Sequence, residues 1–165
     1  MKKTLLTGAG GLVGLQVDAD LRIDGKKQLD LRDWEATLNY FEENKPTQVI
    51  HCAAKVGGVL ANMNHMGEFF YDSMAMNLNV LEAARRTGVQ KVVSFLSTCI
   101  YPDQAKYPLA ETDLHSGPPH ESNFAYAYAK RMLEVQSRAY REQYGVNYIC
   151  VVPTNIYGPN DNFNL

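Results

Sequence analysis

The chain has 165 residues, which is enough for one domain with a sizeable hydrophobic core. Its hydrophobic fraction of 45% and charged fraction of 21% are ordinary for a soluble globular protein, and no apolar run approaches the ~18 residues that a membrane span needs. A formal net charge of -2 gives no electrostatic reason to expect nucleic acid or an anionic membrane as a partner.

Three cysteines, Cys52, Cys99 and Cys150, lie in or beside predicted strands. An odd number of cysteines at such positions favours reduced thiols in a cytoplasmic protein. Their spacing does not suggest a metal site.

The first predicted element is a short strand over residues 3–7, which leads directly into a loop with glycines at positions 8, 11 and 14. Glycine lets the backbone turn tightly and approach a pyrophosphate, and a following helix would offer its N-terminal amides to that charge. A strand, a glycine loop and an apolar helix start in this order predict a dinucleotide site.

Residues 15–27 leave room only for a stunted helix and a brief strand around residues 21–23. An acidic residue that binds the ribose normally follows the glycine loop by about 20 residues, and Asp24 comes too early for that role. Arg22, Lys26 and Lys27 could meet a 2′-phosphate, which favours NADP over NAD. The alternative is that they are three solvated surface cations.

Strand and helix patterns alternate along the rest of the chain. Asp33 is expected to cap a helix that continues to about Glu43. Further strands are predicted over 48–52, 91–96 and 146–152, further helices over 71–87 and 123–144, and an irregular segment over 103–122. This alternation predicts an α/β fold, a doubly wound parallel (Rossmann) sheet of strand order 3-2-1-4-5, in one domain over residues 1–165. His51 is interpreted as a packed residue of the third strand.

The candidate chemistry lies at the end of the fourth strand and the start of the last helix. Tyr126 and Lys130 are four residues apart, which places them on one face of that helix. An ammonium group beside a phenol lowers the pKa of the phenol, so that it can act as an acid or base near neutral pH. Ser97, at the carboxyl end of the strand, could hydrogen-bond the same substrate oxygen as Tyr126.

Each of these residues also has a purely structural interpretation. A tyrosine and a lysine four apart are commonly a half-buried ring and a solvated amine. Cys99 could be a small buried residue with an inert thiol.

Five short motifs stand in order along the chain. They are Gly-Ala-Gly-Gly-Leu-Val-Gly from residue 8, His-Cys-Ala-Ala-Lys-Val-Gly-Gly from 51, Leu-Ser-Thr-Cys-Ile-Tyr-Pro from 96, Tyr-Ala-Tyr-Ala-Lys-Arg-Met from 126, and Pro-Thr-Asn-Ile-Tyr-Gly-Pro-Asn-Asp-Asn-Phe from 153. Together they resemble the motifs of the GDP-L-fucose synthases, a family of the extended short-chain dehydrogenase/reductase superfamily. The resemblance covers nearly the whole chain apart from the shortened region 15–27.

The resemblance implies a two-stage reaction on GDP-4-keto-6-deoxy-D-mannose. The sugar is epimerised at C3 and C5, where each carbon loses and regains a proton beside the 4-keto group. NADPH then reduces C4 to give GDP-L-fucose.

The resemblance also assigns roles by motif. Tyr126 would protonate the 4-oxygen, Lys130 would lower the Tyr126 pKa and hold the nicotinamide ribose, and Cys99 would be an acid or base of the epimerisation. Ser97 would bind the substrate oxygen and stabilise enolate charge. The residues implied for the cofactor's pyrophosphate are Gly8, Gly11, Leu12, Val13 and Gly14, and those implied for its nicotinamide are Pro153, Asn155 and Ile156. Asn155 would also contact the substrate.

The family places a catalytic histidine and a substrate domain beyond the Asp-Asn-Phe motif, whereas this sequence ends at Leu165. The substrate domain is therefore expected to be largely absent from these residues, with weak or no turnover by them alone. The resemblance further implies a homodimer that pairs helices 71–87 and 123–144. Two alternatives stay open, a non-catalytic dinucleotide-binding module and another epimerase or reductase of nucleotide sugars.

Overall fold

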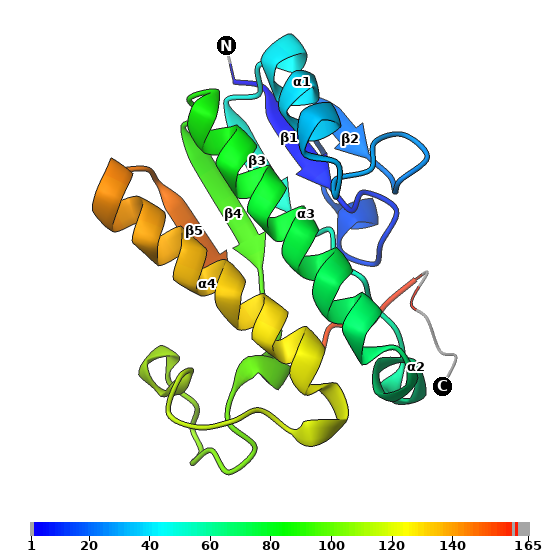
Figure 1. The fold of residues 1–165 in the computed structure, drawn as a ribbon, viewed down its shortest axis with the longest axis vertical. Helices are drawn as coiled ribbons and strands as arrows, with labels where there is room; N and C mark the ends of the chain where they lie inside the picture. The colour runs from blue at the N-terminus through cyan, green and yellow to red at the C-terminus, as the bar shows by residue number, and fades with distance from the viewer. Residues whose placement is uncertain (1, 160, 162–165) are drawn as a thin grey trace.

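A five-stranded sheet forms the centre of the molecule, which is seen here in a computed structural model that describes residues 2–159 and 161 (Figure 1). The strands are β1 (Thr4–Thr7), β2 (Leu21–Ile23), β3 (Gln48–His51), β4 (Lys91–Phe95) and β5 (Tyr148–Val151). The helices are α1 (Trp34–Asn44), α2 (Val59–Asn64), α3 (Met66–Arg86) and α4 (Phe124–Tyr144), with short 3-10 turns η1 (Gly14–Gln16), η2 (Thr98–Ile100), η3 (Glu111–Asp113) and η4 (Glu121–Asn123).

All neighbouring strands are parallel, which confirms the predicted α/β fold, but the strand order is β2-β1-β3-β4-β5 and the predicted order 3-2-1-4-5 is wrong. β3 pairs with β1, placing Val49 beside Leu5, and does not extend the sheet beyond β2. Between β2 and α1 the chain forms only turns. It then passes through α1 and enters β3, which pairs with β1 on the side opposite β2. The winding direction therefore reverses between β1 and β3, where ligands bind in sheets of this kind.

Side chains alternate between the two faces of the sheet, and the three long helices lie side by side over one of them (Figure 1). In register on this face are the buried residues Leu5, Val49, Val92 and Tyr148. Two residues further along each strand, the same face carries Thr7, His51, Ser94 and Cys150. The core is therefore apolar at its centre and becomes polar toward the carboxyl ends of the strands.

The helix ends follow local sequence signals. The Asp33 carboxylate accepts a hydrogen bond of 3.0 Å from the Ala36 N–H, which confirms the predicted cap of α1. Gly145 ends α4 in the left-handed conformation, with φ at 67°. Residues 103–122 are irregular apart from short 3-10 turns, as predicted.

The third helix begins at Met66, five residues before the predicted start, and α2 precedes it. Phe69, Ser73 and Asn77 are all buried on one face of α3, at a spacing of four residues. Two of these three are polar, so the hydrophobic period that predicts helices is interrupted in the sequence. Within residues 2–159 and 161, no helix is both long enough and apolar enough to cross a membrane.

Candidate cofactor and active site

The glycine loop folds tightly against the end of β3. Gly8 has a φ of 73°, and a Cβ atom built on it would lie 2.7 Å from the Ala53 amide nitrogen. A Cβ on Gly14 would collide with the Gly8 carbonyl oxygen and lie 2.8 Å from the Ala9 Cα. Only glycine fits these two positions, which leaves the loop backbone free to approach a ligand. The helix expected after the loop is reduced to the single 3-10 turn η1.

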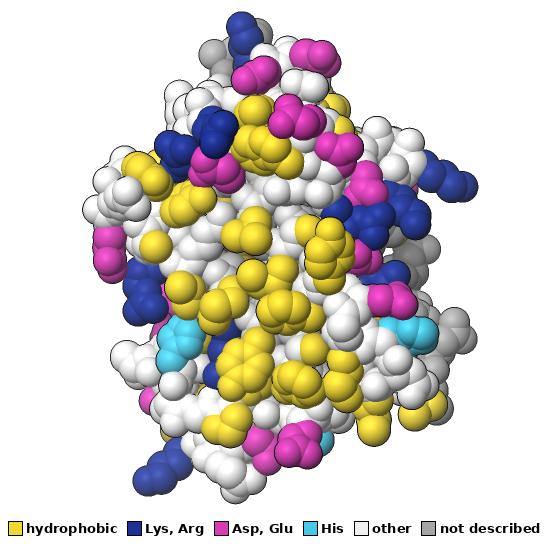
Figure 2. All heavy atoms as spheres, in the orientation of Figure 1, with side chains coloured by type: hydrophobic (Ala, Val, Ile, Leu, Met, Phe, Trp, Pro, Cys, Tyr) yellow, Lys and Arg dark blue, Asp and Glu magenta, His cyan; other side chains and the backbone are white. Residues whose placement is uncertain are grey.

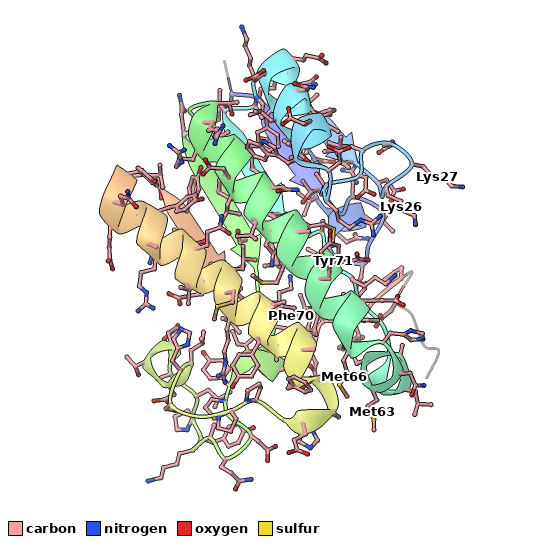
Figure 3. All side chains as sticks on the ribbon, viewed as in Figure 1. Lys26, Lys27, Met63, Met66, Phe70 and Tyr71 are labelled. Carbon is pink, nitrogen blue, oxygen red and sulfur yellow. The ribbon has the colours of Figure 1, made fainter. Side chains whose placement is uncertain are left out.

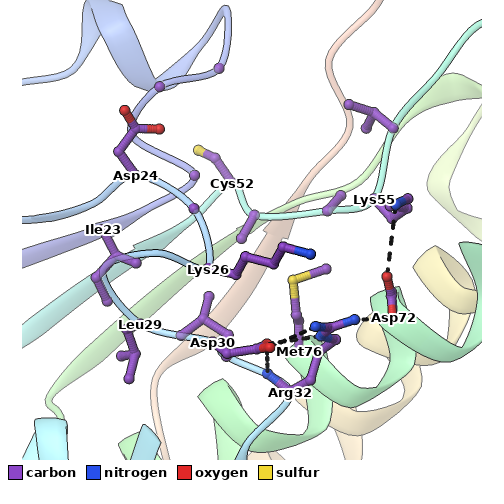
Figure 4. Close-up of a pocket in the computed structure, with 18 residues that line it drawn as sticks. Ile23, Asp24, Lys26, Leu29, Asp30, Arg32, Cys52, Lys55, Asp72 and Met76 are labelled. Atoms are coloured by element: carbon purple, nitrogen blue, oxygen red, sulfur yellow. Dashed lines mark hydrogen bonds and ion pairs between the residues drawn. The ribbon is translucent and has the colours of Figure 1, made fainter.

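A cavity of about 340 Å³ opens beside this loop, at the carboxyl ends of β1, β2 and β3 (Figure 4). Its wall contains, among others, Gly8, Gly10, Gly11, Asp24, Lys26, Arg32, Cys52, Lys55, Asp72 and Met76. The predicted loop residues Gly8 and Gly11 line the cavity, whereas Leu12, Val13 and Gly14 are not part of its wall. The position matches the reversal of winding between β1 and β3, and the size suits part of a dinucleotide.

An ion-pair network that the sequence analysis did not identify braces one side of the cavity. Arg32 pairs with Asp30 at 2.6 Å and with Asp72 at 2.8 Å, and the Lys55 Nζ lies 4.0 Å from Asp72 (Figure 4). The hydrogen bond from Arg32 lowers the pKa of Asp30 to about 2. Because Arg32 and Asp72 are 40 residues apart, no local pattern indicates their pairing.

Only one of the three cations predicted to meet a 2′-phosphate lines the cavity. Arg22 instead donates to the backbone carbonyls of Val17, Ala9 and Gly14, with a distance of 2.8 Å to the Gly14 oxygen. Lys27 points away from the molecule (Figure 3). Lys26 extends across the cavity (Figure 4). The Arg22 guanidinium thus binds carbonyls of the glycine loop, and its contact with a 2′-phosphate stays a prediction.

Two adjacent residues of α4 fix the segment of residues 96–100 that follows β4, here called the polar corner. The Lys130 Nζ donates to the Phe95 carbonyl oxygen at 2.7 Å, and the Arg131 Nε donates to the Ile100 carbonyl oxygen at 2.6 Å. Between these points the Ser97 Oγ accepts from the Cys99 N–H at 3.5 Å and caps η2. The corner is thus held at both ends by the helix that carries Tyr126.

The Lys130 Nζ lies 6.0 Å from the centre of the Tyr126 ring, so the structure brings the two together as predicted. The expected lowering of the Tyr126 pKa is wrong, however, because burial raises the pKa of this phenol. Burial also lowers the pKa of Lys130 to about 8 and raises the pKa of the Cys99 thiol. At neutral pH Tyr126 and Cys99 therefore hold their protons, and Lys130 is largely charged.

The predicted nicotinamide residues Pro153, Asn155 and Ile156 follow the carboxyl end of β5. They do not line the cavity. This segment runs back to the glycine loop, because a Cβ built on Gly158 would lie 3.8 Å from the Leu12 Cδ1. Asn160, Asn162 and Phe163 of the last motif lie outside the described residues.

The profile of the NAD dependent epimerase/dehydratase family matches residues 4–165. The chain belongs to this family. It is 47% identical to GDP-L-fucose synthase of Dictyostelium discoideum, a match that covers 99% of this chain and 54% of that protein. GDP-L-fucose synthase of Escherichia coli is 36% identical, with 99% of this chain and 53% of that protein covered.

A solved structure of a GDP-L-fucose synthetase agrees with these sequence matches. The crystal structure of a GDP-L-fucose synthetase from Naegleria fowleri bound to NADP has a TM-score of 0.88 and 44% identity, and the match covers 99% of this chain and 53% of that one. The resemblance stated from the motifs is thereby confirmed. The chain spans about half the length of the curated relatives it matches.

His51, the last residue of β3, gives a testable pH dependence of stability. Burial, assisted by the charge of Lys130, lowers the pKa of His51 from 6.5 to about 4. Between these values the unfolded chain binds more protons than the folded one, so the free energy of unfolding should fall as the pH falls. The difference of 6.5 minus 4 corresponds to about 3 kcal/mol at most.

Urea unfolding from pH 4.5 to 6.5 measures this effect. The carboxyls of Asp30 and Glu82 have pKa values lowered to about 2 from 3.8 and 4.5, so their stabilising contribution starts to be lost only near the lower end of this range, and both proteins compared below share that loss. The variant His51→Gln has no imidazole and should show a much smaller slope. Equal slopes in the two proteins would contradict the assignment.

Proposed function

We propose that this chain supplies the dinucleotide site and the acid–base centre of an enzyme that converts GDP-4-keto-6-deoxy-D-mannose to GDP-L-fucose. The reaction is an NADPH-dependent epimerisation at C3 and C5 followed by reduction at C4. The observation that carries the proposal is the gathering of Ser97, Cys99, Tyr126 and Lys130 where β4 meets α4, on a family member whose glycine loop lies at the same edge of the sheet.

The residues of the cavity fit a dinucleotide. The two glycine positions that exclude a Cβ atom leave room for a pyrophosphate beside the backbone, and Lys26 offers a positive charge for a 2′-phosphate. The relative from Naegleria fowleri, which is described as bound to NADP, supports the same cofactor for this chain. NADPH, when bound, supplies the hydride for C4.

The side chains of the corner would move the protons. Tyr126, which is protonated at neutral pH, would donate its proton to the 4-oxygen as reduction proceeds, and the charge of Lys130 would stabilise the phenolate left behind. Ser97 would donate a hydrogen bond to the same oxygen and stabilise the enolate formed during epimerisation. Cys99 carries a raised pKa, which suits a thiol that donates a proton to a carbon next to the ketone.

The test uses the native protein, purified at its full natural length, with GDP-4-keto-6-deoxy-D-mannose and NADPH in D2O. We expect NADPH oxidation, GDP-L-fucose as product, and deuterium at C3 and C5. In the variant Cys99→Ser, formation of GDP-L-fucose should fall by about 10²-fold or more, because a hydroxyl is a far weaker acid at this position. Cys150→Ser makes the same chemical change on β5. Within the described residues, the Cys150 thiol has one hydrogen-bond partner, the Ser137 Oγ, so this variant should keep the native activity.

Two outcomes would count against the proposal. NADPH binding without oxidation of NADPH by any 4-keto sugar nucleotide would support the non-catalytic binding module instead. Oxidation with a different 4-keto nucleotide sugar, but not with the GDP sugar, would support another epimerase or reductase. Equal losses in Cys99→Ser and Cys150→Ser would remove the catalytic role of Cys99.

The exposed face of the helix pair α3–α4 supports the proposed homodimer. Hydrophobic atoms gather over these two helices (Figure 2), and an apolar groove between them is lined by Met74, Leu78, Met132 and Val135, among others. Leu78, which lines this groove, is 46% exposed, and Phe70, which is also on α3, is 41% exposed (Figure 3). Apolar patches of this kind mark protein interfaces.

Sedimentation equilibrium measures the association. We expect the native protein to sediment as a dimer and the variant Leu78→Lys to sediment as a monomer, because a charge would have to be buried in the interface. A native protein that is monomeric at micromolar concentration would contradict the dimer.

The three cysteines, all of them free, support the proposed cytoplasmic location.

A further inference from the structure

A chain of buried hydrogen bonds crosses the core from the strand before the glycine loop to the helix that carries Lys130. The Thr7 Oγ1 lies 2.7 Å from the His51 Nδ1, and the His51 Nε2 lies 3.0 Å from the Asn77 Oδ1. The Asn77 Nδ2 donates at 3.3 Å to the carbonyl oxygen of Ala129, the residue directly before Lys130. Thr7, His51 and Ala129 are fully buried, and Asn77 is 2% exposed. The mechanism proposed above uses none of the three polar side chains.

The donors and acceptors fix the direction of every bond in this chain. The Ala129 carbonyl only accepts, so the Asn77 amide must present its Nδ2 to Ala129 and its Oδ1 to His51. The His51 Nε2 therefore carries the hydrogen. Because a neutral imidazole has one protonated nitrogen, the His51 Nδ1 accepts from the Thr7 hydroxyl. The Thr7 Oγ1 in turn accepts from the Ala53 N–H at 3.4 Å.

The surroundings of His51 favour its neutral form. The ring is fully buried, and the charge of Lys130 acts on it, so that both burial and Lys130 oppose a second proton. The Lys130 ammonium is itself buried and donates to the Phe95 carbonyl. A protonated His51 would place two positive charges in one desolvated region.

We propose that His51 and Asn77 are positioning residues for Lys130: a neutral His51 with its hydrogen on Nε2 holds Asn77, and Asn77 holds the α4 backbone at Ala129. The hydrogen bond from Asn77 to the Ala129 carbonyl positions the backbone of α4 so that the Lys130 Nζ reaches the Phe95 carbonyl and stays beside Tyr126. The catalytic consequence rests on the proposed function, whereas the placement of Lys130 does not. Both can therefore be tested separately.

The first test needs no variant. Nitrogen-15 NMR of the native protein distinguishes a protonated Nε2 from a protonated Nδ1 by the chemical shifts of the two ring nitrogens. We expect the signature of the Nε2–H form at pH 7. An Nδ1–H form, or a charged ring, would overturn the proposal.

The second test compares two amide replacements of the imidazole. Glutamine in His51→Gln can place its amide nitrogen where Nε2 stood and donate to Asn77, whereas asparagine in His51→Asn reaches only the position of Nδ1. Carbon-13 NMR of the lysine Cε follows the titration of Lys130, which should have a pKa of about 8 in the native protein. We expect this pKa to stay within about half a unit in His51→Gln and to rise by about one unit or more in His51→Asn, as water reaches a released ammonium.

The two variants also separate positioning from general stability. Both remove a buried ring, so a merely structural role would lower the melting temperature of both and leave the same Lys130 pKa in each. Such equal titrations would overturn the proposal. NADPH affinity should fall about tenfold in His51→Asn and less than about twofold in His51→Gln, the effect of losing one hydrogen bond that orients a buried group. If the native protein does not bind NADPH, the proposed function fails, while the Lys130 titration still decides the positioning.

Discussion

Replacing Tyr126 with phenylalanine should lower the rate of NADPH-dependent reduction by about 10² to 10⁴-fold, the range typical for removal of a general acid. The half-buried phenol is protonated at neutral pH and lies beside the Lys130 ammonium, so it is the group best placed to donate a proton. The absorbance of NADPH at saturating substrate measures the effect. Affinity for NADPH should change by less than about twofold, because the variant keeps the ring.

Tyr128→Phe is the matched control for this change. Tyr128 lies on the same helix two residues away, is partly exposed, and packs its ring against Arg131 at 5.2 Å. Removing its hydroxyl should leave the rate within about twofold. A Tyr126→Phe enzyme that retains the native rate would exclude Tyr126 as the acid, and equal losses in both variants would indicate damage to α4 rather than to the chemistry.

Replacing Gly14 with alanine should destabilise the protein by about 2 to 4 kcal/mol and weaken NADPH binding by more than about tenfold. The new Cβ would collide with the Gly8 carbonyl and lie 2.8 Å from the Ala9 Cα, and both groups are backbone that cannot rotate away. The loop must open to accept the methyl group, which moves it away from the cavity. Urea unfolding and fluorescence titration with NADPH measure the two effects.

Two other glycines serve as controls for the Gly14 variant. A Cβ on Gly11 would meet only the Gly8 oxygen, at 3.5 Å, so Gly11→Ala should change the free energy of unfolding by less than about 0.5 kcal/mol. Gly25 has a φ of 80° and open space around it, so Gly25→Ala should cost only the backbone strain of about 1 to 2 kcal/mol. A Gly14→Ala protein as stable as Gly11→Ala would show that the loop is not packed as described.

Local patterns in the sequence determined the secondary structure and the kind of chemistry. Asp33 caps α1 because its carboxylate meets an amide three residues away, and Gly145 ends α4 because glycine tolerates a positive φ. The spacing of Tyr126 and Lys130 placed both on one helix face. These features depend on residues within one or two turns of each other, so they can be recognised from the sequence alone.

Tertiary structure decided the rest, because it depends on groups that are far apart in the chain. The pairing of β3 with β1, on the side opposite β2, overturned the predicted strand order. Burial, which no spacing reveals, raised the Tyr126 pKa that the neighbouring Lys130 was expected to lower. The partners Arg32 with Asp72 and His51 with Asn77 are 40 and 26 residues apart. Such contacts form only when the sheet and helices are packed, because a side chain's environment is set by whichever elements the fold places against it.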